Sequence, residues 1–271
     1  MKDTECVEFL YWALPRLHLR WQGFRKVRRQ VCKRIGRRIR ELNLSDGADY
    51  RIYLENHAAE WSVLDDLCRV TISRFYRDRE VFAALEGEVL PVLAEQVLSQ
   101  GEGTLMVWSA GCASGEEPYT LTLLWRFALQ DRYPGLQLAI LATDTELTLL
   151  TRARQACYPA SSLKRLPPTW RESAFEKSGD AWCLRPEYRM GITFLEHDIR
   201  DLPPDGPFYL VLCRNLVLTY FDAELQREVL NRIRDALHPG GILITGARET
   251  LPDDDLGFAS WRGGIPVFRK V

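Results

Sequence analysis

The chain has 271 residues, of which 46% are hydrophobic and 27% charged, so it can bury a sizeable core in one large domain or two smaller ones. Its apolar runs fall short of the about 18 residues that a membrane span needs. Its first residues also lack the basic segment and apolar core of a secretory signal. We therefore expect a cytoplasmic protein without a membrane span.

The seven cysteines are scattered singly, without a Cys-x-x-Cys pair. This distribution is typical of reduced thiols in a protein core and argues against disulfides and against a zinc site. The four histidines also lack the spacing of metal ligands. We expect no bound metal.

The net charge of −1 hides an asymmetry along the chain. Residues 1–45 carry 12 Lys and Arg against 4 Asp and Glu, whereas the remainder carries 24 against 33. Two regions of opposite charge indicate two modules, of which the first is suited to an acidic partner.

The most basic stretch is a predicted helix over residues 20–44. Its apolar residues recur at helical spacing, at Val27, Val31, Ile35, Ile39 and Leu42. Ten Lys and Arg lie between Arg20 and Arg40, without an acidic residue. The partner could be an acidic protein surface, RNA or an acidic patch of this same protein, or the run could be a solvated helix face. The acidic remainder and the lack of an aromatic stacking platform argue against nucleic acid.

The next predicted elements are a helical stretch over 49–68, a linker over 71–78 and a helix over 79–99. We therefore expect a helical, basic N-terminal domain over 1–78, a connecting helix and linker over 79–103, and a cofactor-binding domain over 104–271.

From residue 104 the pattern alternates between strands and helices, which predicts a Rossmann-like α/β sheet. The expected strands are 105–110, 137–144, 192–195, 208–213 and 242–245, and the expected helices are 116–131, 146–157 and 223–237. Residues 158–191 are rich in Pro and Gly and read as a small inserted β subdomain, with short strands at 182–184 and 188–190. The tail over 258–268, with Gly263-Gly264 between apolar flanks, is expected to be a closing hairpin.

The stretch from Val107 to Tyr119 reads as a strand, a glycine turn and a helix, which is how open α/β sheets form a ligand crevice. Gly111 and Gly115 permit positive φ and a close approach of the backbone to a ligand. Glu116 and Glu117, in the first helical turn, would repel a phosphate, and no Gly-Lys-Ser/Thr follows. A cationic cofactor such as S-adenosylmethionine fits better, although the two glutamates could also simply cap the helix.

Two further carboxylates follow predicted strands. Asp144 ends the second strand, where such folds bind a pair of ribose hydroxyls, and it could also cap the next helix. Asp198 could accept a hydrogen bond from an adenine amino group, and Ile199 could cover the ring.

Taken together, these motifs resemble the CheR-type chemotaxis receptor glutamate O-methyltransferases. The matching pieces cover about residues 20–250 and are Ser73-Arg74-Phe75-Tyr76-Arg77, Gly115-Glu116-Glu117-Pro118-Tyr119, Thr143-Asp144, Cys213-Arg214-Asn215, Tyr220-Phe221-Asp222 and Pro239-Gly240-Gly241. The combination is specific, because it joins several uncommon short motifs in one order.

The resemblance implies a small all-helical domain followed by a class I methyltransferase sheet with a small β insertion, binding S-adenosylmethionine and releasing S-adenosylhomocysteine. It implies a cofactor site that includes Ser73, Arg77, Gly111, Glu117, Asp144, Asp198, Ile199, Arg214 and Asn215. Arg77 and Tyr220 would lie nearest the transferred methyl group. The basic helix would dock an acidic helical, receptor-like substrate through Arg28, Arg29, Arg34, Arg37 and Arg38. We expect a monomer.

The chain departs from the family at three places. Asp198-Ile199 stands where the family usually has Asn-Leu, one extra residue separates Asn215 from Tyr220, and Tyr76 stands where the family has Phe. Two other interpretations therefore remain open: the same fold and cofactor with a small molecule or another side chain as acceptor, and a catalytically idle module that senses the cofactor or binds a partner. A dehydrogenase is disfavoured, because no Gly-x-Gly-x-x-Gly precedes the helix.

Overall fold

The computed structural model describes residues 2–252, 256–261 and 265–271. The chain forms two compact units, the first running to Thr71 and including Thr219–Gln226, the second comprising Ile72–Leu218 and Arg227–Val271. The sequence boundaries did not anticipate that residues 219–226 would join the helical unit. No helix in the described part of the chain combines the length and apolar character needed to cross a membrane.

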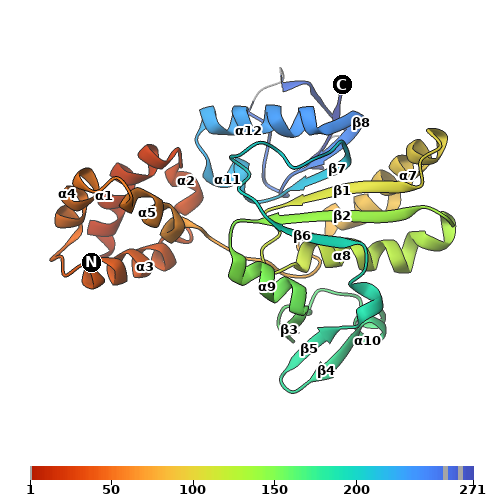
Figure 1. Ribbon diagram of the computed structural model, residues 1–271, viewed down its shortest axis with the longest axis horizontal. Coiled ribbons are helices and arrows are strands. Elements are labelled where there is room, and N and C mark those ends of the chain that lie inside the picture. The colour runs from red at the N-terminus through yellow and green to blue at the C-terminus, as the bar shows by residue number, and fades with distance from the viewer. Residues whose placement is uncertain (1, 253–255, 262–264) are drawn as a thin grey trace. The chain divides into compact units, whose positions relative to one another are not determined.

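The first unit is built from short helices (Figure 1): α1 (Asp3–Ala13), the 3-10 turn η1 (Leu14–Leu17), α2 (Trp21–Phe24), α3 (Arg28–Glu41), α4 (Gly47–Asn56) and α5 (Glu60–Cys68). The helix predicted over 20–44 is therefore two helices, because residues 25–27 form a turn. The apolar stripe of α3 is confirmed: Val31, Ile35 and Ile39 are buried. Helix α1 was not predicted, although its buried residues Cys6, Phe9, Leu10 and Ala13 follow helical spacing.

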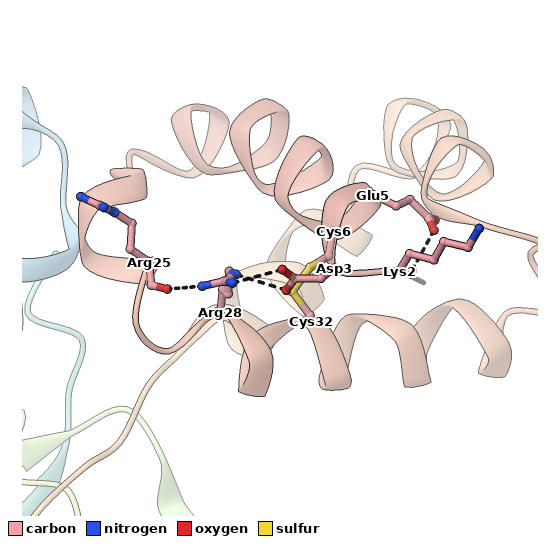
Figure 2. The surroundings of a disulfide bond; sticks show 7 residues. All are labelled: Lys2, Asp3, Glu5, Cys6, Arg25, Arg28 and Cys32. Atoms are coloured by element: carbon pink, nitrogen blue, oxygen red, sulfur yellow. Dashed lines mark hydrogen bonds and ion pairs between the residues drawn. A yellow bond between two sulfur atoms is a disulfide. The ribbon is translucent and has the colours of Figure 1, made fainter.

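Two disulfides correct the expectation of reduced thiols. Cys6 of α1 is bonded to Cys32 of α3, and Cys157 is bonded to Cys183. Figure 2 shows the first of these beside the ion pair of Arg28 with Asp3. Each pair is separated by 26 residues and meets only through helix packing or strand pairing, so sequence spacing could not reveal it. Cys68, Cys112 and Cys213 are free and buried.

The second unit contains a seven-stranded sheet in the order β6-β2-β1-β7-β8-β10-β9. Its strands are β1 (Thr104–Ala110), β2 (Gln137–Asp144), β6 (Ile192–Glu196), β7 (Phe208–Cys213), β8 (Leu237–Ile244), β9 (Phe258–Ser260) and β10 (Val267–Lys270). The first five of these are mutually parallel, whereas β10 runs antiparallel to both β8 and β9. The chain leaves β1 toward β2 and β6 and later returns on the other side at β7, so the strand order reverses between β1 and β7. Ligands bind at such a switch point in open α/β sheets.

The helices of this unit are α6 (Arg79–Ala84), the π turn η2 (Leu85–Val89), α7 (Leu90–Ser99), α8 (Glu116–Leu124), η3 (Trp125–Leu129), η4 (Gln130–Arg132), α9 (Leu147–Gln155), α10 (Pro168–Ala174), η5 (Pro186–Tyr188), α11 (Val217–Tyr220) and α12 (Ala223–Ala236). The end of α11 and the start of α12 lie in Thr219–Gln226, which belongs to the first unit. Figure 1 shows α12 on one side of the sheet and α8 and α9 on the other. Strand β7 is buried along its whole length, as expected for a central parallel strand covered on both faces. The predicted fold class is confirmed.

The predicted insertion is a separate three-stranded antiparallel sheet in the order β3-β5-β4, formed by Cys157–Pro159, Ala181–Leu184 and Phe175–Ser178 respectively. The strand expected at 188–190 was wrong, because Pro186 begins the 3-10 turn η5 there. In the predicted closing hairpin, β9 and β10 do pair antiparallel. Gly263-Gly264 lies outside the described residues.

Candidate active site

The carboxyl ends of four strands meet at one edge of the main sheet. Ala110 at the end of β1 is paired with Thr143 of β2 and with Cys213 of β7, and Asp144 is paired with Glu196 of β6. The predicted site residues that follow these strands are therefore brought to one edge by the strand register alone.

The turn after β1 is fixed by the carboxylate of Asp144. Its Oδ2 accepts from the Ala113 N–H at 2.8 Å and its Oδ1 accepts from the Glu146 N–H at 3.0 Å. Gly111 and Gly115 have φ of +77° and +89°, the positive values predicted for them. Asp144 thus links the glycine turn to the residue that precedes α9, but it does not cap that helix as the alternative interpretation expected, because the N-cap position is Glu146.

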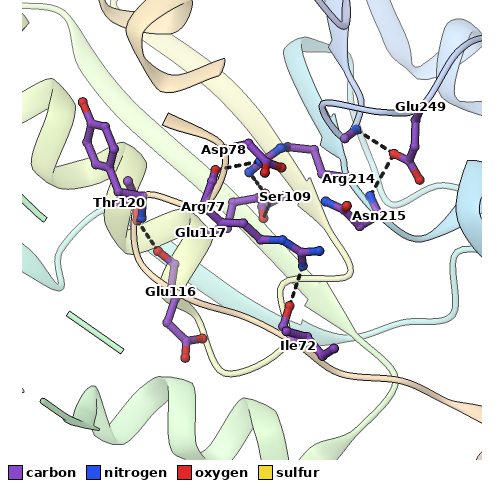
Figure 3. Close-up of polar contacts among 12 residues, drawn as sticks. Ile72, Arg77, Asp78, Ser109, Glu116, Glu117, Thr120, Arg214, Asn215 and Glu249 are labelled. Atoms are coloured by element: carbon purple, nitrogen blue, oxygen red, sulfur yellow. Dashed lines mark hydrogen bonds and ion pairs between the residues drawn. The ribbon is translucent and has the colours of Figure 1, made fainter. Parts of the chain in front are cut away.

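The two glutamates at the start of α8 have different surroundings. Glu116 is buried and accepts hydrogen bonds from Ser114 at 2.9 Å and from Ser162 at 3.2 Å. Glu117 accepts from Ser109 at 2.8 Å and keeps 16% of its side chain exposed. Figure 3 shows the Glu116 carboxylate directed away from the polar cluster that Glu117 joins. Glu116 therefore serves the fold, and Glu117 faces the candidate site.

Arg214 is the hub of this cluster (Figure 3). Its guanidinium donates at 2.8 Å to the Glu117 carboxylate, to the Asp78 carboxylate and to the carbonyl oxygen of Arg77. It also lies over the ring of Phe82, and its side chain is only 2% exposed. Arg214 therefore contacts the protein on nearly every side and would act on a cofactor through Glu117.

The loop that carries Arg77 has an uncommon backbone. Tyr76 and Asp78 have φ of +54° and +60°, in the left-handed region that side chains with a Cβ rarely adopt. The Tyr76 N–H donates to Thr120 at 3.1 Å, and the Arg77 side chain donates to the Ile72 carbonyl at 2.6 Å. Strained backbone that its surroundings hold in place is characteristic of functional sites.

Asn215 is held by a residue that the sequence did not indicate. One Glu249 oxygen accepts from the Asn215 N–H at 2.9 Å and from the Gly246 N–H at 2.6 Å. Asn215 also has a positive φ, +56°, which Asn tolerates better than most residues. The loops after β7 and β8 are joined at this carboxylate.

Asp198 and Ile199 follow β6. Asp198 forms a close ion pair with Arg200, with Nη2 and Oδ2 2.7 Å apart, and Ile199 is buried. Each oxygen of this carboxylate accepts two hydrogen bonds from Arg200, one from its backbone N–H and the others from its guanidinium.

Two further predicted residues have other surroundings. Ser73 is half-buried in the loop before Arg77. Tyr220 belongs to the first unit, where its ring packs edge-on against Phe24.

The predicted docking arginines have two different environments. Arg28 binds Asp3, Arg34 donates to the carbonyls of Leu67 and Arg69, and Arg38 binds Glu60. Arg29 and Arg37 are exposed. Periodicity located the helix, but only its packing shows which cations hold the domain together.

Two free thiols lie near the strand ends. Burial raises the pKa of Cys112 well above its ordinary value, and burial likewise raises the pKa of Cys213. Both are therefore protonated and weakly nucleophilic at neutral pH.

The residues of the second unit fit S-adenosylmethionine by their chemistry. Glu117 and Asp144 place carboxylate oxygens at the carboxyl ends of β1 and β2, next to the glycine turn. Such oxygens accept from an ammonium group and from ribose hydroxyls, and they attract a sulfonium. The sequence missed Asp78, Ser109 and Glu249, which hold the predicted residues without belonging to a recognisable motif.

A doubly wound sheet with carboxylates at the carboxyl ends of its strands defines a Rossmann-like cofactor-binding domain of the methyltransferase type. Comparison with known proteins names the family: a model of the CheR methyltransferase SAM binding domain matches residues 71–263. The chain therefore belongs to the CheR methyltransferase family, as predicted, and is an S-adenosylmethionine-dependent methyltransferase.

Individual relatives agree. The chemotaxis protein methyltransferase of Listeria innocua is 37% identical over 195 residues, covering 72% of this chain and 71% of the relative. That of Klebsiella aerogenes is 31% identical over 230 residues, covering 82% and 75%. An uncharacterized 104.1 kDa protein of Rhodobacter capsulatus is 35% identical over 240 residues, covering 87% of this chain and 25% of that protein.

Proposed function

We propose that this enzyme transfers the methyl group of S-adenosylmethionine to glutamate side chains of a chemoreceptor in the cytoplasm. Membership of the CheR family and relatives named chemotaxis protein methyltransferases support the substrate. The observation that carries the site is the network joining Arg77, Asp78, Arg214 and Glu117 at the strand ends.

On the cofactor side, the bound molecule supplies a methyl group on a positively charged sulfur. Glu117 accepts from its ammonium group, because Ser109 and Arg214 hold that carboxylate in one orientation. Asp144 accepts from the ribose hydroxyls, Asp198 accepts from the adenine amino group, and Ile199 covers the ring. Gly111 leaves room for the backbone to approach.

On the acceptor side, no general base is needed. A glutamate carboxylate has an unperturbed pKa of about 4.3, so it is already ionised at neutral pH. The protein's task is to align this carboxylate and exclude water. Arg77 and Tyr220 orient the acceptor, by ion pairing and by a phenolic hydrogen bond.

The proposed docking surface differs from the predicted one in three of its five residues. We assign it to a basic stripe of exposed residues, defined as Lys26, Arg29, Lys33, Arg37 and Arg40. They recur at intervals of three or four residues, so those on α3 share one face of the helix. Arg28, Arg34 and Arg38 are left out, because they bind groups within their own unit.

The first experiment uses S-adenosylmethionine with a labelled methyl group, a purified chemoreceptor cytoplasmic fragment and the full-length enzyme. We expect label on the receptor that leaves as methanol in mild alkali, which identifies a carboxyl methyl ester. Stable label on protein, or label only in small molecules of a cell extract, would contradict the proposed acceptor. Binding of S-adenosylhomocysteine without any transfer would instead indicate an idle module.

The basic stripe is tested by reversing two of its charges, Arg29→Glu with Arg37→Glu. We expect KM for the receptor fragment to rise at least about tenfold, with the affinity for S-adenosylhomocysteine unchanged, since exposed charges act mainly on association. Arg132→Glu with Arg165→Glu, at two exposed positions of the second unit, is the matched control. Equal effects of the two changes would show that net charge alone matters.

A further inference from the structure

Residues 219–226 pair with the segment that follows η1 in the helical unit. This arrangement is held by backbone links: the Arg20 N–H donates to the Tyr220 carbonyl at 2.8 Å, the Asp222 N–H donates to the His18 carbonyl at 2.9 Å, and Leu19 forms an antiparallel bridge with Phe221. Tyr220 is thus held through its own main chain.

Side chains add to this pairing. Arg20 Nε donates to the Thr219 carbonyl at 3.2 Å, and His18 Nδ1 lies 3.1 Å from a carboxylate oxygen of Asp222. The ring of Phe24 packs edge-on against the ring of Tyr220, with centroids 5.2 Å apart. Both the backbone and the ring of Tyr220 are therefore held by the same short segment.

Gly23 shows how close the contact is. A Cβ at this position would lie less than 3.0 Å from the Thr219 carbonyl oxygen and 3.0 Å from Cδ1 of Tyr220. Because the nearest atom belongs to the backbone, no flexible side chain could move aside. A residue larger than glycine would push the Thr219-Tyr220 peptide away.

We propose that His18–Phe24 is a positioning element for Tyr220, which it holds for methyl transfer while taking no part in cofactor binding. This inference rests on the proposed role of Tyr220 in orienting the acceptor. The same segment leads after a three-residue turn into α3, which carries most of the basic stripe. Substrate docking and the orientation of Tyr220 are therefore properties of one structural unit, which couples recognition of the acceptor to turnover.

The test is Gly23→Ala in the full-length enzyme, assayed with the chemoreceptor fragment. A displacement of about 1 Å of an orienting group can cost about 100-fold, so we expect kcat to fall about 10- to 100-fold. The dissociation constant for S-adenosylhomocysteine should stay within about twofold, because the proposed cofactor contacts lie in the second unit. Gly87→Ala is the matched control: it also adds a methyl group to a helical glycine, but no atom beyond its neighbouring residues and its own helix backbone lies within 4 Å of the added Cβ, so kcat should not change.

Two further variants keep the outcome decisive. Arg20→Met removes the side-chain bond to the Thr219 carbonyl and keeps the backbone link from the Arg20 N–H to Tyr220, so it should lower kcat less than Gly23→Ala, with an unchanged melting temperature. If Gly23→Ala unfolds the helical unit, Arg20→Met alone tests the positioning element.

Tyr220→Phe separates the two proposals. Full turnover of this variant would refute the role of Tyr220 itself. Loss of turnover in Tyr220→Phe with normal kcat in Gly23→Ala and Arg20→Met would overturn the positioning element.

Discussion

Arg214 sets the charge balance of the candidate site at the scale of single residues. One guanidinium binds two carboxylates, Glu117 and Asp78, so these three side chains together keep one net negative charge. That residual charge suits a cofactor with a cationic sulfur and an ammonium group. The same guanidinium fixes the carbonyl of Arg77 and so joins the proposed cofactor and acceptor contacts.

Replacing this hub should weaken cofactor binding. Arg214→Met leaves Glu117 and Asp78 to repel each other and releases both from their fixed orientation. A hydrogen bond to a charged group contributes about 1.5–3 kcal/mol, so we expect affinity for S-adenosylhomocysteine to fall about 10- to 100-fold by calorimetry. Arg234→Met removes an arginine that binds Asp235 and Asn231, and it serves as the control. Unchanged affinity in Arg214→Met would contradict the role of Arg214.

The insertion contributes to the site at the scale of elements. Phe75 is buried and packs edge-on against Tyr158 of β3 and Phe175 of β4, while the Tyr76 ring meets Trp170 of α10. The strained loop around Arg77 therefore packs against aromatic side chains of the insertion. Ser162, also in the insertion, binds Glu116 at the start of α8.

The helices of the first unit are joined by a polar hub at Glu60. Arg38 of α3 donates to both Glu60 oxygens at 2.8 Å, and the Tyr50 hydroxyl of α4 donates to Oε1 at 2.8 Å. The hydrogen bonds from Arg38 hold the pKa of the Glu60 carboxyl below its usual value of 4.5. Three helices thus depend on one ionised carboxylate.

This hub predicts a pH dependence of stability. Because the folded pKa of Glu60 is lowered, its contribution is fully present above about pH 4.5 and is lost as the pH falls through the folded pKa. Glu60→Gln should lower the free energy of unfolding by about 2 kcal/mol at pH 7. Urea unfolding between about pH 3 and 7 measures the difference, which should shrink at the acid end. A difference independent of pH would refute the ionic role.

Charge is distributed unevenly along the chain at the scale of the whole molecule. Residues 1–45 have 12 Lys and Arg against 4 Asp and Glu, whereas the rest of the chain has 24 against 33. The proposed docking of an acidic substrate therefore depends on the first 45 residues, and the proposed attraction of a cationic cofactor depends on the acidic remainder.

Salt should separate these two attractions from each other. Raising the salt concentration from about 0.05 to 0.5 M shortens the Debye length severalfold, which screens exposed charges more than half-buried ones. We expect KM for the receptor fragment to rise steeply, while the affinity for S-adenosylhomocysteine changes little. Parallel salt dependence of both constants would contradict a substrate contact made through the exposed stripe.

Local patterns in the sequence were sufficient for much of the fold. Strand 137–144, the glycine turn after β1 and the apolar stripe of α3 were predicted correctly, because each depends on residues close together in the chain. The family motifs identified the cofactor for the same reason: they are short and occur in a fixed order.

Only the tertiary structure decided how these pieces are used. Four features join residues that are distant in the chain. They are the two cysteine pairs, the contacts of three α3 arginines within their own unit, the hydrogen bond of Asn215 to Glu249 and the attachment of Tyr220 to the helical unit. Such contacts depend on which faces of the elements pack together, and no periodicity or spacing records that choice. The sequence by itself therefore determined the fold class, the family and the cofactor, and the packing decided which side chains are free to act.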